Sequence, residues 1–212
     1  MTVTIPLKSI QLAPGSSVTI NDVTWQDFET ILTELGEQRQ VRLTYFQGNL
    51  EMMSPQAAIH ERPHRIIADI VKALLEVRGR DWEDFGSTTF KLPVYVGVET
   101  DGFFYIQNAA QMQIYKQMDV AAIYLPPDLA IESDVTPKKI LEVYAAIGVP
   151  EVWIYHQQKL EIYTYINGSY QESFLSPAFP DFAVVVLIPI LVQEAIEVGT
   201  SKMLQKLKSE IK

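Results

Sequence analysis

Cysteine is absent from this chain of 212 residues, which excludes disulfide bonds and thiolate metal sites. That absence is typical of a reducing compartment, so we expect a cytoplasmic protein. Long hydrophobic runs are missing as well. The longest, residues 182–192, is interrupted by Pro189 and is too short to span a bilayer. The N-terminus lacks the basic and then apolar order of a signal peptide, so we expect neither export nor membrane insertion.

The sequence also lacks any linker rich in Pro, Gly or Ser, any block of like charge and any internal repeat. Its 48% hydrophobic and 20% charged residues are ordinary for a globular protein, and its length is sufficient for a large core. We therefore expect a single domain over residues 1–212. Within it, residues 1–20 should form a loosely held N-terminus and residues 200–212 a terminal helix.

Positive charge is scarce, with 17 Lys and Arg residues against 26 Asp and Glu residues and a net charge of −9. Broad affinity for nucleic acid depends on Lys and Arg contacts to phosphate, so this balance counts against a nuclease. It does not exclude one. Part of the acidic excess can be a carboxylate cluster that a divalent cation neutralises.

The most informative stretch is residues 99–153, which contains a predicted strand over residues 127–132. Its alternation sends Leu129 and Ile131 to one face of the sheet and Asp128, Ala130 and Glu132 to the other. Glu132 lies at the carboxyl end of this strand, where ligands gather in open α/β sheets. We therefore expect Glu132 to be a functional residue.

A helix and a second strand should follow. Thr136 is placed to cap the helix, Pro137 suits its first position, and Gly148 ends it after Ile147. Residues 149–156 are rich in β-branched and aromatic side chains and predict a strand. Because such a crossover joins parallel strands, the strands at 128–132 and 152–156 should be parallel neighbours in one sheet.

Other segments predict helices and hairpins around this unit. Asp101 opens an apolar strand and shares a face with Phe103 and Tyr105. A helix that Thr24 caps should end at Gly36. Hairpins are expected around Gly48-Asn49, in residues 41–53, and around Asn167-Gly168, in residues 160–174. Residues 107–126 carry no clear pattern.

His60 and His64 stand at the entrance of a long amphipathic helix, and His60-Glu61-Arg62-Pro63-His64 matches the H-E-x-x-H pattern of zinc proteases. In that pattern both histidines face the metal from one continuous helix. Proline is comfortable only in the first turn of a helix, so we expect Pro63 to lie there and His60 to lie outside the helix. We therefore reject the zinc protease interpretation.

Several motifs taken in order resemble one known family. They are Gly48-Asn49-Leu50-Glu51-Met52-Met53-Ser54-Pro55 with His60, then Glu99-Thr100-Asp101, then Asp128-Leu129-Ala130-Ile131-Glu132, and finally Tyr144-Ala145-Ala146-Ile147-Gly148-Val149-Pro150-Glu151-Val152-Trp153. Together they resemble the Uma-type putative restriction endonucleases of the PD-(D/E)XK nuclease superfamily, over residues 22–192. The resemblance implies an α/β fold with a restriction endonuclease-like core. In that core a central mixed β-sheet is flanked by helices. The expected N-terminal helix and hairpin and the expected C-terminal hairpin are additions to the core.

The resemblance also implies a catalytic site, with Asp101 and Glu132 as metal ligands and a lysine beside them. The sequence departs from the motif twice, because Thr100 stands where Pro is expected and Asp134 stands where the lysine is expected. Lys138 or Lys139, on the following helix, can return an ammonium group to the same pocket, and we favour Lys139. These neighbours lie about 100° apart on a helix, so the sequence alone does not decide between them.

The chemistry of these residues fits phosphodiester hydrolysis. Asp and Glu are hard oxygen ligands of the kind that Mg²⁺ or Mn²⁺ takes. A carboxylate-bound cation activates water and neutralises phosphate charge, and a positioned lysine can stabilise the transition state. His60 can support the pocket as a polar or proton-relay group.

Two functions remain open from the sequence. The first is a Mg²⁺-dependent endonuclease acting on DNA, for which a homodimer would suit cutting of both strands. The second is a nuclease-fold protein that has lost catalysis together with the in-motif lysine and acts as an interaction or regulatory module. The retained Asp101 and Glu132 favour the first function, and the net charge favours the second.

Overall fold

The computed structural model describes residues 6–36, 39–54, 58–86, 88–115, 125–133, 135 and 137–211, with the side chains of residues 8, 58–61, 114 and 115 outside the description. Its helices are η1 (Leu7–Ser9), α1 (Trp25–Leu35), α2 (Ala58–Val77), α3 (Ala109–Tyr115), α4 (Pro137–Ile147), α5 (Val184–Val198) and α6 (Thr200–Glu210). Its strands are β1 (Ser17–Ile20), β2 (Arg42–Phe46), β3 (Asn49–Met53), β4 (Glu83–Asp84), β5 (Thr89–Leu92), β6 (Val96–Glu99), β7 (Gly102–Tyr105), β8 (Leu129–Ser133), β9 (Glu151–His156), β10 (Lys159–Ile166) and β11 (Ser169–Ser173).

A mixed sheet of six strands, in the order β11-β10-β9-β8-β7-β4, forms the centre of the molecule. β8 and β9 are parallel neighbours joined through α4, as the sequence predicts, and the other pairs in this sheet are antiparallel. Four of the five residues of β8 are buried, because both faces of this central strand are covered. The structure therefore confirms a mixed sheet flanked by helices.

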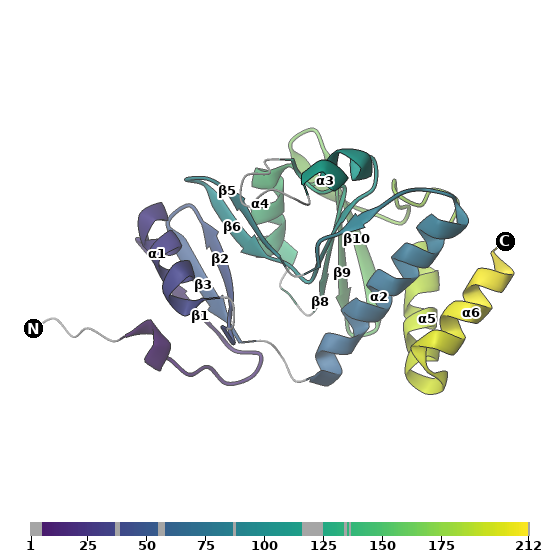
Figure 1. Ribbon diagram of the computed structural model, residues 1–212, viewed down its shortest axis with the longest axis horizontal. Coiled ribbons are helices and arrows are strands. Elements are labelled where there is room, and N and C mark those ends of the chain that lie inside the picture. The colour runs from purple at the N-terminus through teal and green to yellow at the C-terminus, as the bar shows by residue number, and fades with distance from the viewer. Residues whose placement is uncertain are drawn as a thin grey trace, which may run out of the picture.

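Helices cover both faces of this sheet (Figure 1). α2 and α5 pack against one face, around a core that includes Trp153, Phe104 and Leu74, and α6 packs on these two helices. The alternate side chains of the same strands, including Ala130 and Val152, pack with α4 on the other face. Alternate side chains of β8 therefore belong to two different hydrophobic cores, and Glu132 lies on the face that α4 covers.

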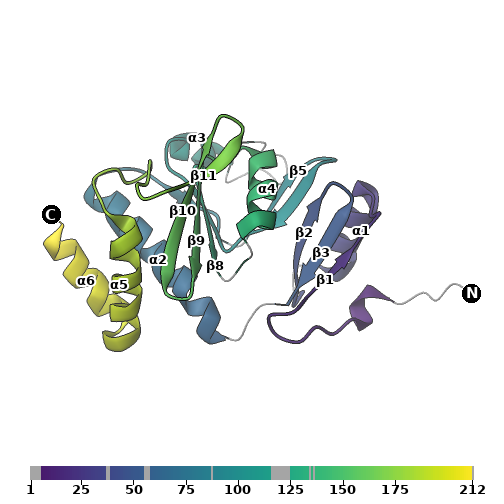
Figure 2. The ribbon, with the colours of Figure 1, turned by 180° about the vertical axis from the view of Figure 1, so that it is seen from behind.

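An antiparallel sheet of five strands, in the order β1-β3-β2-β6-β5, lies beside the first (Figure 2). α1 covers it and places Phe28 against Gly97 of β6, so closely that a side chain at position 97 would collide with the ring. The chain passes from this sheet to the six-stranded sheet where β6 ends at Glu99 and β7 begins at Gly102. Asp101 is therefore at the corner between the two sheets.

Local signals for helix ends and one hairpin are confirmed. Thr24 and Asp27 form a reciprocal capping box at the start of α1, which ends at Gly36. The hairpin β10–β11 turns at Asn167-Gly168 with positive φ at both residues, as the type I′ turn requires. In the hairpin β2–β3 the turn residues are Gln47 and Gly48, both with positive φ, one position before the expected pair.

Two expectations are wrong in part. Ser17–Ile20 forms β1, paired with β3, so the N-terminal segment is not loose throughout. α2 begins at Ala58 and contains Pro63 beyond its first turn, so His60 lies within the helix. Pro63 removes one backbone hydrogen-bond donor near the start of the helix. The packing of the following turns offsets this loss. No structure is predicted for residues 107–126, and the structure places α3 within this segment.

The predicted terminal helix is present as α6. It is not simply solvated, because Met203 and Leu207 are buried against α2 and α5. Across the described ranges, no helix has both the length and the apolar character needed to cross a membrane.

Candidate active site

Asp101 and Glu132 lie next to each other at the corner between the sheets. β7 and β8 are antiparallel and their register ends with Gly102 opposite Ile131, so Asp101 and Glu132 are the next residues beyond it. The Asp101 charge acts on Glu132, which agrees with this placement. Residues opposite each other in an antiparallel pair point to the same face, with Cβ atoms about 5 Å apart. The structure therefore brings together the two carboxylates that the sequence places 31 residues apart.

Both oxygens of Asp101 have protein partners. Oδ2 accepts hydrogen bonds from the backbone N–H of Ser133 at 2.8 Å and from its hydroxyl at 2.6 Å. Oδ1 forms an ion pair with the Arg42 guanidinium. The Asp101 side chain is 1% exposed, so these contacts replace water almost completely. A buried carboxylate needs such partners, because a desolvated and unpaired charge is costly.

Glu132 is buried on the face of the sheet that α4 covers. It accepts a hydrogen bond from the hydroxyl of Tyr144, which is itself fully buried. Burial, with the neighbouring Asp101 charge, raises the pKa of Glu132 from 4.5 to about 8. The Tyr144 hydrogen bond and the Arg42 charge act in the opposite direction but are smaller. The carboxyl group is consequently mostly protonated near neutral pH.

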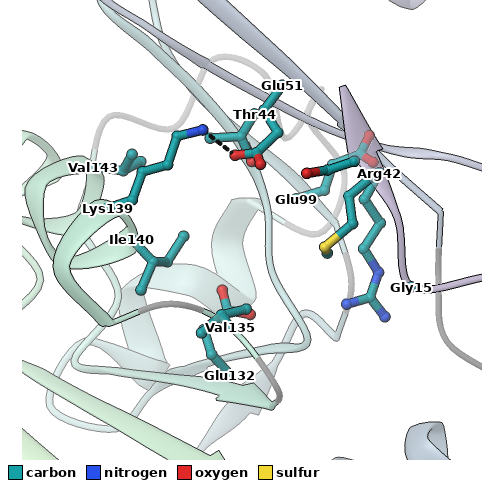
Figure 3. A pocket seen from close by; sticks show the side chains of 12 residues that line it. Gly15, Arg42, Thr44, Glu51, Glu99, Glu132, Val135, Lys139, Ile140 and Val143 are labelled. Atoms are coloured by element: carbon teal, nitrogen blue, oxygen red, sulfur yellow. Dashed lines mark ion pairs between the residues drawn. The ribbon is translucent and has the colours of Figure 1, made fainter. Parts of the chain in front are cut away.

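A pocket of about 200 Å³ opens beside Glu132, between β2, β3 and α4. Its polar lining includes Arg42, Glu51, Glu99 and Lys139, with Glu132 at its base (Figure 3). Lys139 Nζ extends across it to Glu51 Oε2 at 2.6 Å. The Lys139 side chain is 50% exposed, so this cation remains accessible from solvent.

Glu99 belongs to the same lining, but its carboxylate serves the five-stranded sheet. Oε2 accepts the backbone N–H of Leu43 at 3.0 Å, and Oε1 accepts the hydroxyl of Thr89 at 2.9 Å and pairs with Arg39. These contacts connect β2, β5 and β6 where the chain leaves the sheet. Glu99 therefore holds the end of β6 in place, two residues before Asp101.

The residues predicted from sequence are placed as follows. Glu132 and Lys139 both line the pocket, whereas Lys138 is exposed and does not line it. Asp101 lies next to Glu132 but is not part of the lining. The side chain of His60 and the whole of Asp134 lie outside the described residues.

Arg42 and Tyr144 were missed by the sequence reasoning, although each directly contacts a predicted carboxylate. For Arg42 a signal existed, because β2 alternates Arg42 and Thr44 with the buried Leu43 and Tyr45, which points a polar face away from the core. Tyr144 lies within a quoted motif, but it resembles an ordinary helix core residue.

The donor set fits a divalent cation in one respect. Mg²⁺ is commonly held by one or two carboxylates together with waters and substrate phosphates, and Asp101 and Glu132 are two such donors on one face. In the part of the chain that the structure describes, no group of three or more potential ligands is present. Among the described residues, a cation held here would draw on these two carboxylates, together with ligands from water or substrate.

Comparisons with known proteins agree with this fold. A family model described as Uma2, putative restriction endonuclease, matches residues 25–193. A crystal structure described as a putative nuclease belonging to DUF820, from Anabaena variabilis, superposes with a TM-score of 0.56 at 15% identity and covers 80% of this chain and 98% of that one. No curated protein matches significantly. The structural similarity confirms the predicted nuclease-type fold.

Proposed function

Because this chain belongs to the Uma2 family of putative restriction endonucleases, we propose that it is a metal-dependent nuclease that hydrolyses phosphodiester bonds of DNA. The observation that carries the proposal is the cross-strand pair of Asp101 and Glu132 beside a pocket that also contains Lys139. A surface with a net charge of −9 needs a local source of positive charge to approach DNA. A cation held by the carboxylate pair, together with Lys139, would supply it.

Each residue has a role in this proposal. Asp101 and Glu132 hold Mg²⁺ or Mn²⁺, which when bound activates water and neutralises charge on the phosphate. Lys139 leaves Glu51 to contact the phosphate, and its ammonium group stabilises the charge that develops there. Tyr144 orients Glu132 through its hydroxyl, so it acts as a positioning residue.

Cleavage of plasmid DNA tests this proposal. The wild type should nick supercoiled DNA only when Mg²⁺ or Mn²⁺ is present, and Asp101→Asn should remove both cleavage and the metal-induced rise in Tm. Lys139→Ala should retain the rise in Tm and lower kcat about 10²-fold to 10³-fold, because it removes transition-state stabilisation. Lys138→Ala is the matched control and should cleave like the wild type. Lys138 is next to Lys139 in the sequence, but its side chain does not line the pocket.

The second candidate function is a catalytically degenerate interaction or regulatory module, and the state of the carboxylates favours it. Asp101 has both oxygens engaged, and Glu132 is mostly protonated near neutral pH. Metal-induced stabilisation without cleavage of any DNA or RNA would favour this module. Cleavage that Asp101→Asn leaves intact would contradict the proposed active site.

The proposal extends to assembly and location. A homodimer would suit cutting of both DNA strands, and sedimentation of the wild type with and without a DNA duplex measures whether it dimerises. A cytoplasmic location follows the expectation from the missing cysteines.

A further inference from the structure

Arg42 contacts the candidate site from the neighbouring sheet. It comes from β2 of the five-stranded sheet and forms an ion pair with Asp101 Oδ1 at the corner of the other sheet. Both side chains are shielded from water, with 17% of Arg42 and 1% of Asp101 exposed. A pair so poorly solvated interacts more strongly than a surface ion pair.

The guanidinium occupies the only oxygen of Asp101 that Ser133 leaves available, since both Ser133 donors bind Oδ2. Its charge also acts on Glu132, the second carboxylate of the pair. Arg42 lines the pocket next to Glu132, on the side away from the Lys139–Glu51 contact (Figure 3). One cationic group therefore interacts with both carboxylates that would hold a metal.

Lys139 does not take this position. Its ammonium group is bound to Glu51, a residue of β3, and its side chain is half exposed. Arginine is charged at any pH that the folded protein experiences, so Arg42 provides a permanent positive charge. A divalent cation on Asp101 Oδ1 would meet that charge within a few ångströms, and the repulsion would be weakly screened.

We propose that Arg42 is a built-in cation that occupies the metal position of the Asp101–Glu132 pair, so that a divalent metal binds only by displacing the guanidinium from Asp101. The inference rests on the metal site of the proposed function and adds a competitor to it. Arg42 would thereby stabilise the metal-free protein and lower its affinity for metal. A simple structural brace would act oppositely, because removing a brace loosens the ligands and weakens metal binding.

Calorimetric titration with Mn²⁺ at one fixed pH tests this. Arg42→Gln should lower the Kd for Mn²⁺ about tenfold or more, a change of about 1.4 kcal/mol. It should also lower the Tm of the metal-free protein and enlarge the rise in Tm that Mn²⁺ produces. Lys139→Gln is the matched control, because it removes the other cation of the pocket without touching Asp101, and its Kd should change less than about threefold.

A measurement on the wild type covers the case in which Arg42→Gln does not fold. The side-chain Nε–H signal of Arg42, assigned by its loss in Arg42→Lys, should shift and exchange faster with water when Mg²⁺ is added. The inference is wrong if metal binds and this signal stays unchanged, or if folded Arg42→Gln binds Mn²⁺ no more tightly than the wild type.

Failure of the proposed function looks different. If neither the wild type nor folded Arg42→Gln binds Mn²⁺, Asp101 and Glu132 do not form a metal site. The proposed function and the inference are then both contradicted. If both bind equally and the wild type cleaves DNA, the inference alone is overturned. Binding by Arg42→Gln with none by the wild type supports the inference in its strongest form.

Discussion

Replacing Glu132 with glutamine should remove a pH-dependent loss of stability from this protein. Glutamine has nearly the shape of the protonated carboxyl and can still accept the hydrogen bond from Tyr144, but it cannot ionise. The side chain is 2% exposed, so an ionised carboxylate there would be poorly solvated. The difference between wild type and Glu132→Gln therefore isolates the cost of ionising this one group.

The pKa of Glu132 sets the size and the direction of the effect. It is 4.5 ordinarily and is raised to about 8 in the folded protein, chiefly by burial and then by Asp101. Stability from the protonated group is fully present below pH 4.5 and is lost as the pH rises through about 8, because only the unfolded chain ionises in that interval. At ~1.4 kcal/mol per pH unit the loss approaches about 5 kcal/mol.

Chemical unfolding of both proteins in urea between pH 5 and pH 9 measures this difference. The two free energies of unfolding should be similar at the acidic end, and Glu132→Gln should become the more stable protein by several kcal/mol at the alkaline end. Glu142→Gln is the matched control, since this carboxylate is exposed on the same helix that carries Tyr144. Its stability curve should run parallel to that of the wild type.

Parallel curves for wild type and Glu132→Gln over the whole range would refute the reasoning. Such a result would mean that Glu132 ionises in the folded protein as readily as in water. The Arg42 charge and the hydrogen bond from Tyr144 would then outweigh burial, contrary to the order of effects in the structure.

Other variants test packing around the site. Tyr144→Phe should destabilise the protein by about 1–3 kcal/mol, because buried Glu132 loses the hydrogen bond from the Tyr144 hydroxyl; urea unfolding measures this. Gly97→Ala should cost about 1–3 kcal/mol, because a Cβ there collides with an α1 ring, and a lowered Tm would show it. Met203→Ala should cost about 2–5 kcal/mol in urea unfolding, whereas Lys208→Ala, in an exposed ion pair, should change stability by less than about 1 kcal/mol.

Local features of the fold could be predicted from the sequence because they depend on residues close together in the chain. The capping box at Thr24, the stop at Gly36 and the turn at Asn167-Gly168 each involve contacts within a few residues. Pro137 and Gly148 likewise bound α4. Such elements are decided by backbone preferences and short-range hydrogen bonds, so one sequence is enough to read them.

The candidate site could be predicted only in part. The order of motifs, through the family resemblance, pointed to Asp101 and Glu132, and the antiparallel register of β7 and β8 brings the two carboxylates together. The choice of Lys139 over Lys138 as the lysine that lines the pocket depended on how α4 is rotated against the sheets. No periodicity within α4 alone fixes that rotation, because both lysines lie in its first turn.

Tertiary structure alone decided the charges around the carboxylates. Arg42 reaches Asp101 across 59 residues of sequence, and Tyr144 reaches Glu132 from a helix that must first pack on the sheet. The same holds for β1, whose residues Ser17–Ile20 form a strand by pairing with β3. These contacts join separate elements, so their existence depends on how the two sheets and α4 pack, whereas the helix caps and tight turns need only their own few residues.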